Sequence, residues 1–232
     1  MKTTKYKSTN QFVRTNAGTN TVSANDEEMD SAKGTLGFFI NTIQVSQVQV
    51  PIDEPVQEPR YYRDVVNMLQ KASEHDTVEF LINTPGGDIS GLNALLFGLE
   101  VTEASTLATL VGECHSAGSL LALSCDAIQV ADNATMLCHA ASFGSSGKSP
   151  DVHSRVLHIA DATAKLMRKA YAGFLTESEV TSLLEGKDYW FDAEQIKERL
   201  QIRAKLLEEE LAKQQEELEK LTQEPAKKSK GK

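Results

Sequence analysis

Ser116 lies in the stretch L-V-G-E-C-H-S-A-G-S (110–119), where a strand-like run passes through small residues into a helix-like run. A serine hydroxyl at such a turn can act as a nucleophile. The stretch I-N-T-P-G-G (82–87) ends another strand-like run, and its glycines free backbone N–H groups to face a neighbouring segment. A nucleophile beside N–H donors is the core of a serine hydrolase, which also needs a base and an orienting acid.

The backbone N–H groups of Gly87 and Ala117 are the candidate oxyanion hole. In α/β folds, reactive groups collect at the carboxyl ends of parallel strands, where both turns are expected to lie. Ala117 begins a helix-like run, whose first N–H groups favour developing negative charge. Taken singly, a serine before a helix is commonly an N-cap, and P-G-G is commonly a turn. Their pairing at neighbouring strand ends favours the catalytic interpretation.

His139 is the candidate base among the five histidines. It closes the strand-like run T-M-L-C-H (135–139) and enters a Gly/Ser-rich loop, so it can face the same crevice as Ser116. His115 adjoins Ser116, and adjacent side chains in a tight turn diverge. The other histidines are expected on the surface or on a helix: His75, His153 and His158. Spacing does not choose the orienting acid, for which the candidates are Asp126, Asp132, Asp151, Asp161, Asp188 and Asp192.

Composition restricts the class of protein. The 232 residues, 40% of them hydrophobic, are enough for one substantial core with appendages. The net charge of -9 argues against nucleic-acid binding, and no apolar run approaches the roughly 20 residues that cross a bilayer. Three cysteines and a polar amino terminus without a secretory signal predict reduced thiols and a cytoplasmic location.

The chain divides into four zones. Residues 1–34 are polar and lack periodicity, which predicts a flexible segment. Residues 35–191 alternate β-branched runs with amphipathic stretches, which predicts an α/β catalytic domain. Within it we expect strands near 38–50, 78–82, 107–111, 128–130 and 135–138, and helices near 61–72, 91–100, 116–124 and 152–174. The segment between the first strand and the first helix contains three prolines, which favour an extended surface loop.

The last two zones are a helix and a tail. Residues 192–222 are strong helix formers, with a narrow stripe of leucines at 207, 211, 218 and 221, and predict a long charged helix. We favour a solvated helix that leans on the domain over a coiled-coil or docking arm, because the apolar seam is too irregular. Residues 223–232 predict a basic, disordered tail.

Two other patterns in the sequence could suggest a metal or nucleotide site, but neither fits the known spacing. The cysteines and histidines contain no C-x-x-C pair and fit no zinc-finger spacing, so we expect no metal. The stretch S-F-G-S-S-G-K-S (142–149) has serine in place of the first glycine of a P-loop, so we expect no ATP binding on this chain.

Four stretches resemble the proteolytic subunit of the Clp protease family, over about residues 38–195: I-N-T-P-G-G-D-I-S-G-L, L-V-G-E-C-H-S-A-G-S, T-M-L-C-H-A-A-S-F-G-S-S-G and K-D-Y-W-F-D-A-E. The resemblance implies a serine endopeptidase that works through an acyl-enzyme on Ser116. It also selects one aspartate as the orienting acid. The site residues that it implies are Ser116 as nucleophile, His139 as base and Asp188 as acid, with Gly87 and Ala117 as oxyanion donors.

The resemblance also implies an architecture and partners. The fold would be α/β, a repeated ββα superhelix of the Clp and crotonase type, with a protruding handle helix near 152–174. Polypeptide substrates would add as a strand along 142–148, so that backbone hydrogen bonds read little sequence. A homo-oligomeric ring or stacked rings and an AAA+ unfoldase for ATP-dependent proteolysis are the implied partners, with no nucleic acid and no membrane.

Where the sequence departs from the family pattern, other functions have to be considered. Glu113, Cys114 and His115 add bulk and charge beside the nucleophile, where the family has small residues. The long C-terminal helix also resembles that of the phage head-maturation proteases of this fold, which act on capsid or scaffold proteins. The alternatives are such a phage-type protease, an acyl-CoA enzyme of the crotonase fold, and a catalytically silent ring or scaffold subunit.

Overall fold

The computed structural model describes residues 45–223 of the chain, with side chains through residue 219. The predicted flexible segment 1–34, the first part of the predicted strand 38–50 and the tail beyond residue 223 lie outside this range.

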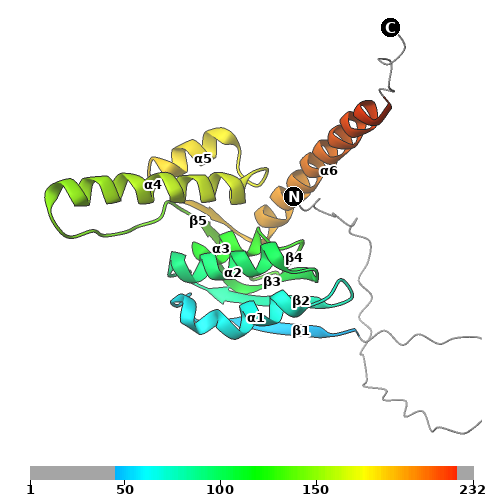
Figure 1. The fold of residues 1–232 in the computed structure, drawn as a ribbon, viewed down its shortest axis with the longest axis horizontal. Helices are drawn as coiled ribbons and strands as arrows, with labels where there is room; N and C mark the ends of the chain where they lie inside the picture. Colours follow the sequence, from blue (N-terminus) through cyan, green and yellow to red (C-terminus); the bar gives the residue numbers. More distant parts are fainter. Residues whose placement is uncertain (1–44, 224–232) are drawn as a thin grey trace, which may run out of the picture. The chain divides into compact units, whose positions relative to one another are not determined.

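A six-stranded sheet forms the centre of the described part (Figure 1). The strand order is β1-β2-β3-β5-β6, and β4 pairs with the first half of β3 while β5 pairs with its last residues. All pairs are parallel except β5 with β6. The strands are β1 (Gln47–Ile52), β2 (Thr77–Thr84), β3 (Ser105–His115), β4 (Ala127–Val130), β5 (Thr135–Cys138) and β6 (Tyr189–Phe191).

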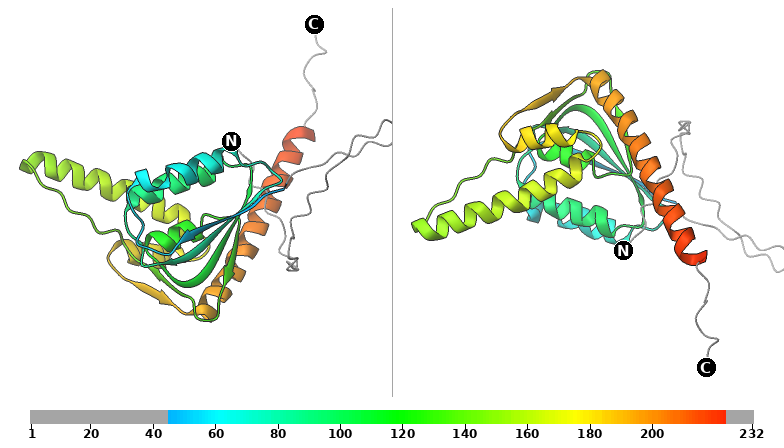
Figure 2. Two further views of the ribbon diagram at one scale, coloured as in Figure 1. Left: turned by 90° about the horizontal axis from the view of Figure 1, so that it is seen from below. Right: turned by 90° about the horizontal axis from the view of Figure 1, so that it is seen from above.

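Helices connect the parallel strands and pack on the sheet (Figure 2). α1, α2 and α3 lie side by side over one face, and α6 contacts β4, β5 and β6. None of the helices between residues 45 and 223 is long and apolar enough to cross a bilayer. The helices are the 3-10 helix η1 (Pro59–Tyr62), α1 (Arg63–Lys71), α2 (Ile89–Val101), α3 (Ala117–Ala122), α4 (Ser149–Tyr171), α5 (Glu177–Leu184) and α6 (Ala193–Gln223).

The core lies between this helical layer and the sheet. Alternate residues of β3 are buried, as a strand with one covered face requires. Leu110 of β3, Phe80 of β2 and Leu95 of α2 are fully buried in the same cluster. The alternation fixes which β3 side chains face the helices, and it continues to Cys114, two residues before Ser116.

The α/β class and most predicted elements are confirmed, with ends that shift by a few residues. Two elements were missed, α5 and β6. The three residues of β6 are too few to show periodicity, and the eight of α5 form barely two turns. Both lie between the end of α4 and the start of α6, so the chain returns to the sheet once more than the sequence indicated.

The two long helices, α4 and α6, are only partly packed. The buried residues of α4 all lie in its C-terminal half, and its N-terminal half projects away from the sheet (Figure 1). The long C-terminal helix is α6, whose Ile196 is fully buried. Farther along α6 the leucines become exposed, and Leu218 has 62% of its surface accessible.

Arg199 of α6 contacts both α5 and β6 and holds them against α6. Its guanidinium donates two hydrogen bonds to the Glu179 carboxylate, at 2.7 and 3.0 Å, and a third to the Phe174 carbonyl. The guanidinium also lies over the Phe191 ring of β6, 4.6 Å from its centroid. Glu179 completes a capping box with Thr176 at the start of α5. One ion pair therefore joins α6, α5 and the last strand.

The Glu179–Arg199 pair should make stability depend on pH. Hydrogen bonds from Arg199 lower the pKa of Glu179 from 4.5 to about 2. A lowered carboxyl pKa stabilises the fold above the unfolded pKa, and the contribution is lost as pH falls through the folded pKa. Glu179→Gln keeps the capping box but removes the charge, and should cost about 1–3 kcal/mol at neutral pH.

The measurement is urea unfolding, followed by circular dichroism, from neutral pH to about pH 2. The difference between wild type and Glu179→Gln should shrink as pH falls from about 4.5 to about 2. Glu177→Gln is the control, because that carboxylate is exposed and 3.7 Å from Arg168. A difference that stays constant with pH would contradict the assignment.

Candidate active site

The backbone of Ser116 is strained at the junction of β3 and α3. Its φ of 53° and ψ of -117° lie outside the regions that L-residues normally occupy. It is the one non-glycine residue between 45 and 223 with positive φ. Such a conformation costs about 1–3 kcal/mol and persists only where the surroundings enforce it. Strained residues cluster at functional sites, so this angle singles out the serine that the sequence proposed.

Pairing of β3 with β5 brings Ser116 and His139 to the same edge of the sheet. His115 is in register with Leu137, and the Ser116 N–H donates a hydrogen bond of 2.9 Å to the Leu137 carbonyl. His139 follows Cys138, the last residue of β5, and is half-buried. The nucleophile and the base proposed from sequence thus lie at the carboxyl ends of two neighbouring parallel strands.

Antiparallel pairing of β6 with β5 ends one residue before Asp188 and His139. The last registered pair is Cys138 with Tyr189, and continuing the register by one residue places Asp188 across from His139. Directly opposite residues have Cβ atoms about 5 Å apart and share a face, within reach of a carboxylate–imidazole hydrogen bond.

The competing aspartates are occupied or remote. Asp126 accepts hydrogen bonds from Thr106, and Asp132 pairs with Lys197 at 2.8 Å. Asp161 pairs with Lys165 on α4, Asp192 caps the start of α6, and Asp151 is exposed at the start of α4. Among the six candidates that the sequence left open, the register therefore favours Asp188.

Gly86 is the residue through which the P-G-G turn meets the serine turn. A Cβ at Gly86, whose φ is +97°, would lie 2.6 Å from the Ser116 Cβ and 3.1 Å from the Ala117 nitrogen. From the sequence we expected a role for Gly87 but none for Gly86. The pair of adjacent glycines could have indicated this role, because Gly86 allows close approach to Ser116 while Gly87 can present its N–H.

The two candidate oxyanion donors are held by different parts of the structure. Ala117 is the first residue of α3, so its N–H has no acceptor within the helix. Gly87 lies in a parallel bridge with Val56, which donates its N–H to the Gly86 carbonyl and accepts one from the Asp88 N–H, both at 2.8 Å. Val56 is 3% exposed, although its proline-rich segment was expected to run along the surface. This segment therefore braces the P-G-G turn.

The His115 side chain contacts Thr135 and Trp190 rather than Ser116, as expected for the residue adjacent to that serine. Its Nε2 lies 3.0 Å from the Thr135 hydroxyl, and its ring contacts the Trp190 ring edge to face at 5.2 Å. Burial lowers the pKa of His115, and the nearby Glu113 carboxylate partly opposes this. Because His75, His153 and His158 are exposed on other elements, His139 remains the candidate base.

In the described part of the chain, the three proposed catalytic residues do not form a closed chain of hydrogen bonds. Between residues 45 and 219, no hydrogen bond joins Ser116 to His139 or His139 to Asp188. Catalytic hydrogen bonds are often long in the absence of substrate and tighten when it binds. Backbone pairing places Ser116 and His139 at the ends of neighbouring strands, and the register of β5 with β6 runs toward Asp188.

The cysteines near the site are poor nucleophiles and poor metal ligands. Burial raises the pKa of the Cys138 thiol to about 12 and also raises those of Cys114 and Cys125. Thiols with raised pKa values stay protonated at neutral pH, whereas both reactions need the thiolate. Within the described residues, no group of three or more His, Cys, Asp or Glu side chains could hold a metal ion.

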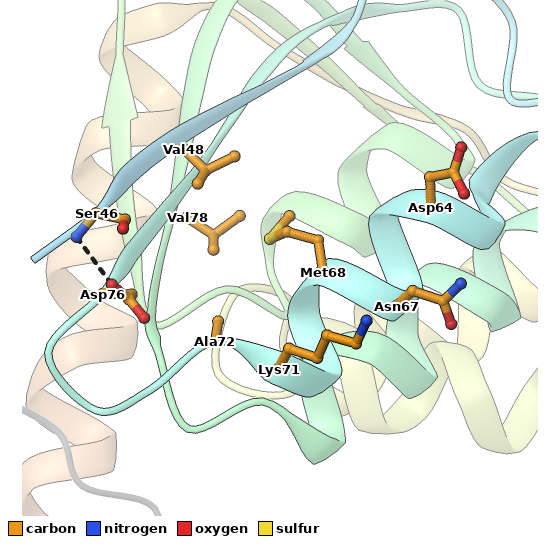
Figure 3. A pocket seen from close by; sticks show the side chains of 9 residues that line it. All are labelled: Ser46, Val48, Asp64, Asn67, Met68, Lys71, Ala72, Asp76 and Val78. Carbon is orange, nitrogen blue, oxygen red and sulfur yellow. Dashed lines mark hydrogen bonds between the residues drawn. The ribbon is translucent and has the colours of Figure 1, made fainter. Parts of the chain in front are cut away.

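A surface pocket of about 520 Å³ lies at the other end of the strands (Figure 3). Val48 and Val78 from the strands and Met68 from α1 provide its apolar lining. At its rim the Ser46 N–H donates a 2.8 Å hydrogen bond to Asp76, whose pKa is lowered to about 2, chiefly by hydrogen bonds from Ser73. The first residues of β1 and β2 border this pocket, so it is separate from the serine turn at the carboxyl edge.

Comparison with protein families gives one finding. The family model described as Clp protease matches residues 43–199, which include every candidate site residue. A search of curated protein sequences finds no match to the chain.

The contact between the two turns can be tested with Gly86→Ala. The added Cβ would clash with Ser116 and strain a positive φ, so we expect a stability loss of about 1–3 kcal/mol or more and loss of fluorophosphonate labelling at Ser116. Gly186→Ala is the control, because its φ is +107° but no atom lies within 4 Å of the added Cβ. Equal labelling of the two variants would show that the turns need not touch.

Proposed function

The chain belongs to the Clp protease family and is thus a Clp-type peptidase; from this we propose that it is a serine endopeptidase acting through an acyl-enzyme on Ser116. The observation that carries the proposal is the strained backbone of Ser116 at a turn that also meets a glycine pair and the end of β5. A serine that served only as an N-cap would have no need of positive φ, since ordinary caps have extended backbone angles.

In the proposed mechanism, Ser116 Oγ attacks the peptide carbonyl carbon while His139 accepts its proton. Asp188 orients the imidazole, and the N–H groups of Gly87 and Ala117 stabilise the oxyanion, each donor being worth about two to three orders of magnitude in rate. The C–N bond then breaks as His139 gives the proton to the leaving amine. Water attacks the acyl-enzyme, His139 takes a proton from it, and the new carboxyl terminus leaves as the serine is restored.

Substrates are proposed to be polypeptides held mainly by their backbone. The segment after His139 has no regular secondary structure through residue 146 and is largely exposed, including Phe143 at 41%. An exposed, irregular segment that follows the candidate base can pair with an extended peptide, which favours broad sequence specificity.

The proposed assembly is a homo-oligomeric ring or a pair of stacked rings. Family membership and the projecting, exposed N-terminal half of α4, with Leu157 58% exposed, support this proposal. An AAA+ unfoldase that supplies unfolded substrate is a further proposal, and it rests on family membership alone.

Ser116→Ala should abolish peptidase activity and fluorophosphonate labelling while native mass and thermal stability stay unchanged. The lost hydroxyl is small, so its removal leaves little cavity. Ser124→Ala, just beyond the other end of α3, is the control and should retain full activity, because the hydroxyl that it removes donates to the Leu120 carbonyl. Equal turnover by Ser116→Ala would reject the nucleophile, and an unlabelled wild-type assembly would favour the catalytically silent interpretation.

Asp188→Asn should leave a weaker enzyme, with kcat reduced about 100-fold to 10,000-fold, since the imidazole loses its orienting charge. The measurement is the steady-state rate of peptide cleavage. Asp132→Asn provides a matched control, because its carboxylate is exposed and pairs with Lys197. An unchanged rate in Asp188→Asn would assign the orienting role to another residue.

A further inference from the structure

A buried polar contact lies directly behind the proposed nucleophile. Ser119 follows Ser116 by one turn of α3 and is fully buried. Its hydroxyl donates a 2.7 Å hydrogen bond to the Ser116 carbonyl, and its N–H donates to the same oxygen at 3.0 Å. The Leu120 N–H adds a third, at 3.2 Å. The Ser116 carbonyl is thus held by three donors from the first turns of α3.

Tyr171, the last residue of α4, reaches this contact from another part of the chain. It is fully buried, and its hydroxyl lies 2.9 Å from the Ser119 hydroxyl. Ser119 has a single hydroxyl hydrogen, and it is given to a carbonyl, which can only accept. Tyr171 must therefore be the donor. Burial raises the pKa of Tyr171, so the phenol keeps the hydrogen that this role requires.

We propose that Tyr171 is a positioning residue for the nucleophile: its hydroxyl fixes the Ser119 hydroxyl, which holds the Ser116 carbonyl and thereby the strained turn. The proposal rests on the assignment of Ser116 as nucleophile. Tyr171 touches neither substrate nor the reacting oxygen, and it acts through two hydrogen bonds in sequence.

The strain at Ser116 is the physical reason that such a relay matters. A φ of 53° with a ψ of -117° relaxes unless contacts on both sides of the residue enforce it. On the N–H side the contact is the bond to Leu137, and on the carbonyl side it is the set of bonds from α3. Without Tyr171 the Ser119 hydroxyl can rotate, and the carbonyl loses its shortest bond. Buried hydrogen bonds in chains strengthen one another, so the two losses should be coupled.

A purely structural role for Tyr171 makes a different prediction. The Tyr171 ring fills space in the core, and phenylalanine would fill nearly the same space. The Tyr171 hydroxyl also hydrogen-bonds to the Cys138 side chain, so Tyr171→Phe removes that contact as well. If only the packing of the ring mattered, Tyr171→Phe would leave the reactivity of Ser116 unchanged.

The test is the second-order rate constant for fluorophosphonate acylation of Ser116 in the full-length protein. The variants are Tyr171→Phe, Ser119→Ala and the double variant, each of which removes only oxygen atoms. Ile196→Val, a core change on α6 outside this network, is the control for lost stability. Thermal denaturation and native mass confirm that each variant is folded and assembled as the wild type is.

We expect Tyr171→Phe and Ser119→Ala each to slow acylation about tenfold, as loss of one net hydrogen bond predicts. The double variant should be no slower than Ser119→Ala, because Tyr171 acts through that hydroxyl. Ile196→Val should react as the wild type does. The apparent pKa of the base in the pH–rate profile should be the same in all variants, since the network does not touch His139.

Two outcomes overturn the proposal while leaving the proposed function intact. One is labelling of Tyr171→Phe at the wild-type rate. The other is a double variant whose rate falls by the product of the two single effects, which would show that the residues act separately. If wild-type Ser116 is not labelled at all, the nucleophile assignment fails and the positioning role fails with it.

Discussion

Parallel pairing of β5 with the end of β3 is the constraint on which the site depends. The hydrogen bond from the Ser116 N–H to the Leu137 carbonyl extends that pairing by one residue, to the point where the chain turns into α3. It holds one side of a backbone conformation that L-residues avoid, and in the same step it places the end of β5, with His139, next to the serine. The strain at Ser116 and its proximity to the candidate base His139 thus have a single structural origin.

Close approach of backbones around this point depends on residues without side-chain bulk. Gly86 meets Ser116, and a Cβ at Gly118 would come within 2.7 Å of Thr84 at the end of β2. Val56 bonds on both sides of Gly87 and keeps the P-G-G turn pressed toward the serine. Since packed interiors leave few voids, one added methyl group here would separate the elements rather than be absorbed. The dense contact explains why the turn can remain strained.

The segment that carries the candidate acid, Asp188, is held by contacts farther from Ser116. Asp188 precedes a strand of three residues that pairs on one side only with β5. A strand this short is weak alone, and Arg199 stabilises it by covering Phe191 while pairing with Glu179 of α5. The first turns of α6 therefore contribute to the site, although the helix carries no candidate catalytic residue. The exposed remainder of α6 makes no such contribution.

The sequence by itself determined the α/β class and most strands and helices, and it proposed a nucleophile and a base at the ends of two strands. These features could be predicted because hydrophobic periodicity and turn glycines depend only on residues close together in the sequence. The sequence did not determine the register of β6 with β5, which distinguishes Asp188 from five other aspartates, and it gave no role to Gly86, Val56 or Tyr171. Those residues matter through contacts between segments far apart in the chain, such as Ser119 with Tyr171. Only the tertiary structure decided them, because pairing across 52 positions leaves no periodic trace in the sequence.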